Sequence, residues 1–217
     1  MEAWEVLLPR ALEILDAVGP DTFWTMGGGT VLMFRHNHRA SKDVDIFFRD
    51  PQPLGYVNPR LGGTAERMTS QYEESSGHVK LYFKEGEIDF VACPLLTSPG
   101  FVTESVLGHT MRLESDVEIV AKKMWHRGHE AKARDLFDLS LVIETCPQEL
   151  TQAAEYLLRH RDAFLGALRT RRSIVKAQFE SIDARDYRPG FEDCVDRVSA
   201  FLNALGDPSG RHVPAPG

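Results

Sequence analysis

The chain has 217 residues, of which 25 are Lys or Arg and 32 are Asp or Glu, so its net charge is −7. It contains no run of about 18 apolar residues, and its acidic start is unlike a signal peptide. We therefore expect a cytoplasmic protein with no membrane contact. The three cysteines, Cys93, Cys146 and Cys194, are far apart and odd in number, which excludes a disulfide framework and a cysteine-based zinc site.

The hydrophobic pattern changes along the chain. Residues 2–18 predict an amphipathic helix that Pro9 kinks or restarts. Short apolar strands with Gly- and Pro-rich connections follow up to residue 114, and the sequence then predicts only helices. Strands followed by helices indicate an α+β core, residues 1–114, and a helical subdomain, residues 115–206. The tail, residues 207–217, is rich in Pro and Gly and is predicted to be disordered.

A glycine turn follows the first predicted strand. Residues 23–26 predict a short buried strand, Gly27 to Gly29 break it, and residues 30–35 predict the start of a helix. A helix N-terminus presents free backbone N–H groups, and glycine allows a phosphate to approach closely. An ordinary strand-to-helix turn also uses glycine, and the spacing matches neither a P-loop nor a dinucleotide fingerprint.

Two aspartates come about a dozen residues later, at Asp43 and Asp45, among apolar residues that favour a strand. Side chains two apart on a strand point to the same face, so both carboxylates are predicted to face one point. Charged groups beside a core need a compensating partner, and Mg²⁺ favours one or two carboxylates together with substrate phosphates. A pair of solvated carboxylates at a strand end would give the same pattern.

A third carboxylate lies in a predicted hairpin, residues 78–83 and 87–91, joined by a turn at residues 84–86. Asp89 lies between two apolar residues and therefore faces the opposite side of the strand from them. Three carboxylates on neighbouring strands can hold two cations, as in phosphoryl or nucleotidyl transfer. Glu87 faces the same side and is the alternative ligand.

Charged residues recur in the predicted helices. Ser115 to Glu118 form a capping-box pattern that starts one helix, and Gly128 is predicted to end it. Lys123 and Arg127 share a face of this helix. Asp135 and Asp138 share a face of the next helix, so a salt-bridge network between the two helices is one interpretation.

A basic run lies further on. Residues 159–176 contain six Arg or Lys side chains against a single acidic residue, Asp162. Such a cluster can contact the phosphates of a nucleic acid, although a solvated helix face has the same composition.

Taken in order, these residues carry a resemblance. The pattern Gly28-Gly29-Thr30, the run from Arg39 through Ser41, Asp43 and Asp45 to Phe47, Lys123, and the run from Lys132 to Leu139 resemble the AbiEii/AbiGii toxin family of nucleotidyltransferases. This family belongs to the DNA polymerase β-like superfamily. The resemblance implies a mixed sheet with flanking helices, a divalent metal (Mg²⁺ or Mn²⁺), and a nucleoside triphosphate as substrate. Members include toxins of bacterial abortive-infection and toxin–antitoxin systems, some of which modify tRNA acceptor ends.

The resemblance also implies residue roles. Asp43 and Asp45 would bind both metals, and Asp89 would bind the metal that activates the attacking hydroxyl. Lys123, with Lys122 one register away, would neutralise phosphate charge, and Asp135 would hold Lys123 or the acceptor. The triphosphate would be positioned by Gly28, Gly29, Thr30 and Ser41.

The predicted function is therefore metal-dependent transfer of a nucleotide to an acceptor, with RNA and above all tRNA as the expected acceptor and a cognate antitoxin as the expected partner. The helical subdomain would complete the active cleft. Two alternatives stay open: kinase-like transfer of the γ-phosphate at the same site, and a non-catalytic module that only binds the nucleotide.

Overall fold

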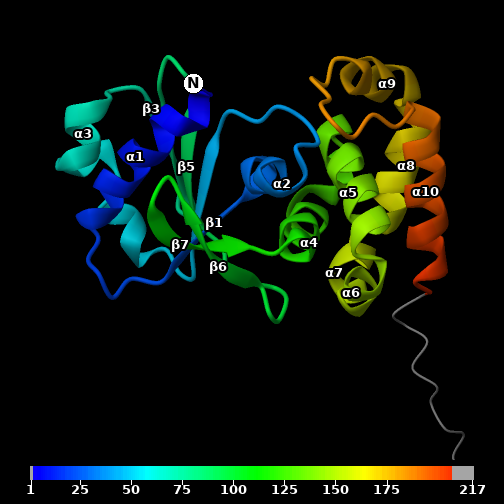
Figure 1. The fold of residues 1–217 in the computed structure, drawn as a ribbon, viewed down its shortest axis with the longest axis horizontal. Coiled ribbons are helices and arrows are strands. Elements are labelled where there is room, and N and C mark those ends of the chain that lie inside the picture. The colour runs from blue at the N-terminus through cyan, green and yellow to red at the C-terminus, as the bar shows by residue number, and fades with distance from the viewer. Residues whose placement is uncertain (1, 207–217) are drawn as a thin grey trace, which may run out of the picture. The chain divides into compact units, whose positions relative to one another are not determined.

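The computed structural model describes residues 2–206 and separates the chain into two compact units, Met1–Ile119 and Val120–Gly217. Unit 1 carries the sheet, and the described part of unit 2 is helical (Figure 1). The boundary falls inside helix α4, Asp116–Arg127, a few residues beyond the predicted change at residue 115. The predicted disordered tail, residues 207–217, lies outside the described residues.

Unit 1 is built on a seven-stranded sheet with the strand order β3-β4-β5-β2-β1-β7-β6. The β1–β7 and β2–β5 pairs are parallel and the other neighbours are antiparallel, so the sheet is mixed, as predicted. The strands are β1 Trp24–Gly27, β2 Val44–Phe48, β3 Tyr72–Glu74, β4 His78–Tyr82, β5 Glu87–Ala92, β6 Phe101–Val106 and β7 His109–Glu114.

Helices flank this sheet. They are α1 Ala3–Asp16, α2 Gly28–His36 and α3 Thr64–Met68, with short 3₁₀ turns η1 Gln52–Gly55 and η2 Pro59–Leu61. Helix α1 packs against β2 and β5, and α2 packs against β1, β2 and β7. Helix α1 runs through Pro9 without interruption, so the predicted restart is wrong.

Alternation along three central strands separates an apolar face from a polar face. The side chains of Val44, Ile46 and Phe48 are fully buried, and they are joined by residues of the same phase on β4 and β5. These neighbours are Val79, Leu81, Ile88 and Phe90. Because side chains alternate along a strand, the residues between them point to the polar face, which carries the predicted site.

Three element boundaries differ from the predicted ones. Strand β2 begins at Val44, so Asp43 precedes the strand instead of lying in it. Strand β1 extends to Gly27, because this residue still pairs with Asp45 of β2. Helix α2 therefore begins at Gly28, earlier than predicted.

Unit 2 is organised around helix α5, Ala133–Thr145, which contacts α6, α9 and α10. Aromatic contacts connect these helices, since the ring centroids of Phe137 and Phe179 lie 5.5 Å apart and those of Phe179 and Phe191 lie 5.4 Å apart. The remaining elements are η3 Gly128–Glu130, α6 Pro147–Gln152, α7 Ala154–Leu158, α8 Arg161–Thr170, α9 Arg172–Glu180 and α10 Phe191–Ala204. Within residues 2–206, no helix combines the length and apolar character needed to cross a membrane.

Candidate active site

The glycine turn brings the backbone of α2 against a carboxylate. Gly28 has φ +73°, and a Cβ atom added there would lie 1.9 Å from Oδ2 of Asp45. Both the left-handed backbone and the close approach require glycine. The first residue of α2 and the carboxylate of Asp45 are therefore neighbours, as the functional interpretation of the turn requires.

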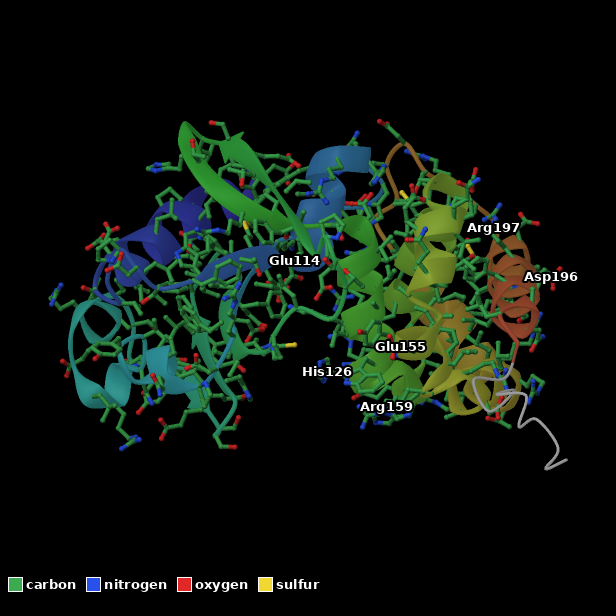
Figure 2. The ribbon with its side chains drawn as sticks, turned by 90° about the horizontal axis from the view of Figure 1, so that it is seen from below. Glu114, His126, Glu155, Arg159, Asp196 and Arg197 are labelled. Atoms are coloured by element: carbon green, nitrogen blue, oxygen red, sulfur yellow. The ribbon has the colours of Figure 1, made fainter. Side chains whose placement is uncertain are left out.

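The preceding glycine is equally confined. A Cβ atom on Gly27 would lie 2.3 Å from Oε2 of Glu114, which is labelled in Figure 2. Glu114 ends β7 and is fully buried, and its Oε1 accepts a hydrogen bond of 2.9 Å from the hydroxyl of Thr25. The sequence interpretation missed this carboxylate, because Glu114 ends a strand in which polar and apolar residues are mixed and nothing marks it out.

Thr30 connects α2 to the start of β2. Its fully buried hydroxyl donates a hydrogen bond of 2.5 Å to the backbone oxygen of Asp43 and lies 2.9 Å from Oγ of Ser41. Two of the residues expected at the triphosphate therefore contact each other. In these contacts, Thr30 fixes the chain segment that delivers Asp43.

The strand register places the aspartates in one row. Across the sheet, Gly27 pairs with Asp45, Asp45 pairs with Asp89, and Asp89 pairs with Lys80. Register partners on adjacent strands point to the same face. The structure thus brings Asp45 and Asp89 together on neighbouring parallel strands.

Asp43 lies just outside this row. Its Oδ1 accepts a hydrogen bond of 3.2 Å from the backbone N–H of Glu87, at the start of β5. A Cβ atom on Gly86 would lie 3.2 Å from the same oxygen. The tight turn before β5 therefore holds the carboxylate of Asp43 beside the start of β5, the strand that carries Asp89.

Asp89 and Glu87 share one lysine. Nζ of Lys80 lies 3.2 Å from Oδ2 of Asp89 and donates a hydrogen bond of 2.7 Å to Oε2 of Glu87. Burial raises the pKa of Asp89 above its ordinary value, and the charge of Lys80 only partly opposes this. Burial also works against the charged form of Lys80, but the two carboxylates outweigh it and raise the pKa of Lys80.

Lys80 was missed by the sequence interpretation, although a signal for it exists. The predicted hairpin has a short turn, and closing it with Tyr82 opposite Glu87 sets Lys80 opposite Asp89. Residues at 78, 80 and 82 also alternate with the buried Val79 and Leu81.

Arg39 is a third residue whose role the sequence interpretation missed. Its side chain is buried, its Nη1 donates a hydrogen bond of 3.2 Å to the backbone oxygen of Ala40, and its Nη2 would lie 2.4 Å from a Cβ atom on Gly29. The guanidinium therefore packs directly on the glycine turn, close to Ser41. A basic residue two positions before Ser41 was visible in the motif but had no assigned role.

The oxygen donors suit a hard divalent cation. Within residues 2–206, no three His, Cys, Asp or Glu side chains are grouped closely enough to hold a metal by themselves. Mg²⁺ commonly takes one or two carboxylates and completes its shell with substrate phosphates and water. Asp45 and Asp89, with Asp43 beside them, fit that requirement without a preformed cage.

Unit 2 contains a separate, buried charge network. Nζ of Lys123 contacts Asp138, and Oδ1 of Asp135 lies 3.8 Å away. Arg127 binds Asp135 with two hydrogen bonds, 2.9 Å from Nε and 2.8 Å from Nη2. Asp135 and Asp138 are 4% and 0% exposed, so the predicted network between the two helices is present and buried. Lys122 is also buried.

The basic run has mostly local contacts. Arg159, labelled in Figure 2, lies over the ring of Trp125 at 4.2 Å, and Arg171 donates a hydrogen bond of 3.1 Å to the backbone oxygen of Glu130. Three further residues form ion pairs: Arg161 with Asp162, Arg172 with Glu192, and Lys176 with Glu180.

A mixed sheet whose adjacent strands carry aspartates beside a glycine turn is the arrangement expected of a nucleotidyltransferase. Residues 10–206 match the family described as nucleotidyl transferase AbiEii toxin, type IV toxin–antitoxin system. The chain belongs to this family, and it is a nucleotidyltransferase of the AbiEii class.

Two solved structures from Helicobacter pylori are similar to the chain. One is a crystal structure of a candidate nucleotidyltransferase, with 14% identity, a TM-score of 0.49, and coverage of 91% of this chain and 93% of that one. The other is the JHP933 protein, with 15% identity, a TM-score of 0.48, and coverage of 91% and 90%. No curated protein matches the sequence.

Proposed function

We propose that this protein transfers a nucleotide from a nucleoside triphosphate to an RNA acceptor, with tRNA as the first candidate. It would act in the cytoplasm as the toxin of a toxin–antitoxin pair, using Mg²⁺ or Mn²⁺. The observation that carries the proposal is the row in which Asp45 faces Gly28 on one side and Asp89 on the other. Family membership supplies the reaction class.

In the proposed reaction, the acceptor hydroxyl oxygen forms a bond to the α-phosphorus, and the bond from that phosphorus to the bridging oxygen breaks. Pyrophosphate leaves and the hydroxyl proton passes to solvent. A bound divalent cation would supply charge stabilisation to the attacking and leaving oxygens. Asp43, Asp45 and Asp89 would hold it, so the chemistry rests on positioning and electrostatics.

The glycine turn would receive the phosphates. Gly28 and Gly29 add no side chain of their own beside the first N–H groups of α2, and such groups favour anions. Ser41 and Thr30 would align the segment that carries the aspartates, through the contact of Thr30 with Asp43.

We assign Lys123 and Asp135 to the same machinery. The support is the resemblance in motif order and the low exposure of these two charged side chains, 10% for Lys123 and 4% for Asp135. Lys123 would neutralise phosphate charge, and Asp135 would hold Lys123 or the acceptor. The close contact of Lys123 with Asp138 adds a positioning partner for this lysine.

The deciding experiment offers the purified chain total RNA with ATP, GTP, CTP or UTP labelled in turn at the α- or the γ-phosphorus. The proposal expects α-label in tRNA and no γ-label. Transfer of γ-label would support the kinase-like alternative, and bound nucleotide without transfer would support the non-catalytic module. Label in protein or small molecules would overturn the RNA acceptor.

The basic run is the proposed RNA contact. Charge reversal of Arg169, Arg171 and Arg172 to Glu is expected to reduce RNA modification while nucleotide binding stays unchanged, and parent activity should fall as salt rises. If the triple variant modifies RNA as well as the parent does, the run is ordinary surface.

For the antitoxin, co-expression of the neighbouring gene is expected to relieve growth arrest by this chain.

A further inference from the structure

We propose that Lys80 is a positioning residue that competes with a divalent cation for the carboxylate of Asp89 and moves fully to Glu87 when that cation binds. The inference rests on the proposed function and deepens it. It predicts that a cation bound through Asp89 has a lower affinity than a cation bound through Asp43 and Asp45. The sequence resemblance assigns Lys80 no role.

The contacts give Lys80 two partners on one face of the sheet. Its Nζ lies 3.2 Å from Oδ2 of Asp89 and 2.7 Å from Oε2 of Glu87. Lys80 is also the register partner of Asp89 on the adjacent strand β4. Asp89 is register partner to Asp45 on the other side. The carboxylate of Asp89 is therefore flanked by an ammonium group from β4 and by the proposed metal ligand from β2.

The positive charge of Lys80 affects a cation bound at Asp89 more strongly than a cation bound at Asp43 and Asp45. An ammonium group in contact with a carboxylate occupies some of its lone pairs and repels any cation that binds the same oxygens. Asp43 has no such neighbour among its described contacts, since its Oδ1 accepts from a backbone N–H. A cation held through Asp43 and Asp45 would feel Lys80 less than a cation that needs Asp89.

Glu87 makes the exchange possible. It already accepts the shorter of the two contacts, so Lys80 can leave Asp89 and keep an anionic partner. The side chains of Lys80 and Glu87 are 25% and 35% exposed, which leaves room for the ammonium group to shift. Without Glu87, withdrawal would leave a partly buried charge with less compensation.

The test measures Mn²⁺ directly, by electron paramagnetic resonance of the free ion, in chelator-stripped full-length protein with a non-hydrolysable nucleoside triphosphate. The parent is expected to show a tight and a weak Mn²⁺. Lys80→Met keeps the length of the side chain but removes its charge, and should tighten the weak ion about tenfold or more. The tight ion should change little.

Matched variants control for folding and for the exchange. Lys80→Arg retains the charge and should behave like the parent, whereas Glu87→Gln should weaken the second ion because Lys80 is then held by Asp89 alone. A cooperative urea unfolding transition first establishes that Lys80→Met is folded. If the folded variant then has both Mn²⁺ affinities unchanged or lowered, this inference alone is overturned. If Asp45→Asn does not reduce Mn²⁺ binding at all, the proposed function falls with it.

Discussion

The two units each bring acidic side chains together, but they compensate the charge differently. In unit 2, Asp135 and Asp138 are almost fully buried and are matched by two cations, Lys123 and Arg127. In unit 1, Asp89 and Glu87 share the single Lys80. The balanced set is suited to rigidity, whereas the acid-rich face of unit 1 is suited to recruit a cation.

Removing one member of the balanced set should have the largest effect on stability. Lys123→Met leaves Asp138 charged and buried without its closest partner, which is expected to lower the free energy of unfolding by about 3–5 kcal/mol. Urea unfolding of the full chain measures this. The double variant Lys123→Met with Asp138→Leu should recover much of the loss, and a single-variant loss below about 1 kcal/mol would contradict the buried network.

A methyl group at the glycine turn should have the next largest effect. Gly28→Ala introduces a Cβ atom against Asp45 at a positive φ, so we expect about 1–3 kcal/mol of destabilisation from the backbone and loss of nucleotide transfer. Gly108→Ala is the matched control, because Gly108 has φ +81° with open space around it. Equal activity in the two variants would show that contact with Asp45 is unimportant.

The acid-rich face should also respond to pH. Burial raises the folded-state pKa of Asp89, so between the ordinary Asp pKa and the raised value the folded protein binds more protons than the unfolded chain. The stabilisation that comes from this additional proton binding is fully present below the ordinary pKa of Asp. It is lost as the pH rises through the raised pKa of Asp89. Asp89→Asn should therefore gain stability relative to the parent as the pH rises from the ordinary Asp pKa through the raised pKa of Asp89, in chelator-treated samples. A constant difference between the two proteins would refute the raised pKa.

The exposed ion pair between Arg172 and Glu192 should have the smallest effect. Both side chains are about half exposed, so Arg172→Ala is expected to change the free energy of unfolding by less than about 1 kcal/mol. A larger loss of unfolding free energy, measured with urea, would contradict the expectation that exposed ion pairs of this chain contribute less to stability than buried ones.

The sequence predicted the polar face of the sheet well, because alternation along a strand fixes which residues share a side. Asp45 and Asp89 could be assigned to one face from the apolar residues around them, and the structure confirms this. Likewise, helix periodicity placed Asp135 and Asp138 together on α5.

Partner choice was harder to predict, because it depends on the register between elements. Periodicity could not decide whether Lys123 contacts Asp135 or Asp138, and the structure favours Asp138. Pro9 is tolerated inside α1 although its type predicts a break, because buried residues on both sides of it hold the helix against the sheet.

The most direct test of the central claim is a paired measurement on Asp45→Asn. The account predicts at least about a hundredfold loss of α-labelled nucleotide transfer, with a free energy of unfolding equal to or above that of the parent, since one charge of an acid-rich face is removed. Near-normal transfer by this variant with Mg²⁺ or Mn²⁺ would contradict the account. Loss of transfer together with unfolding would assign Asp45 to structure instead of chemistry.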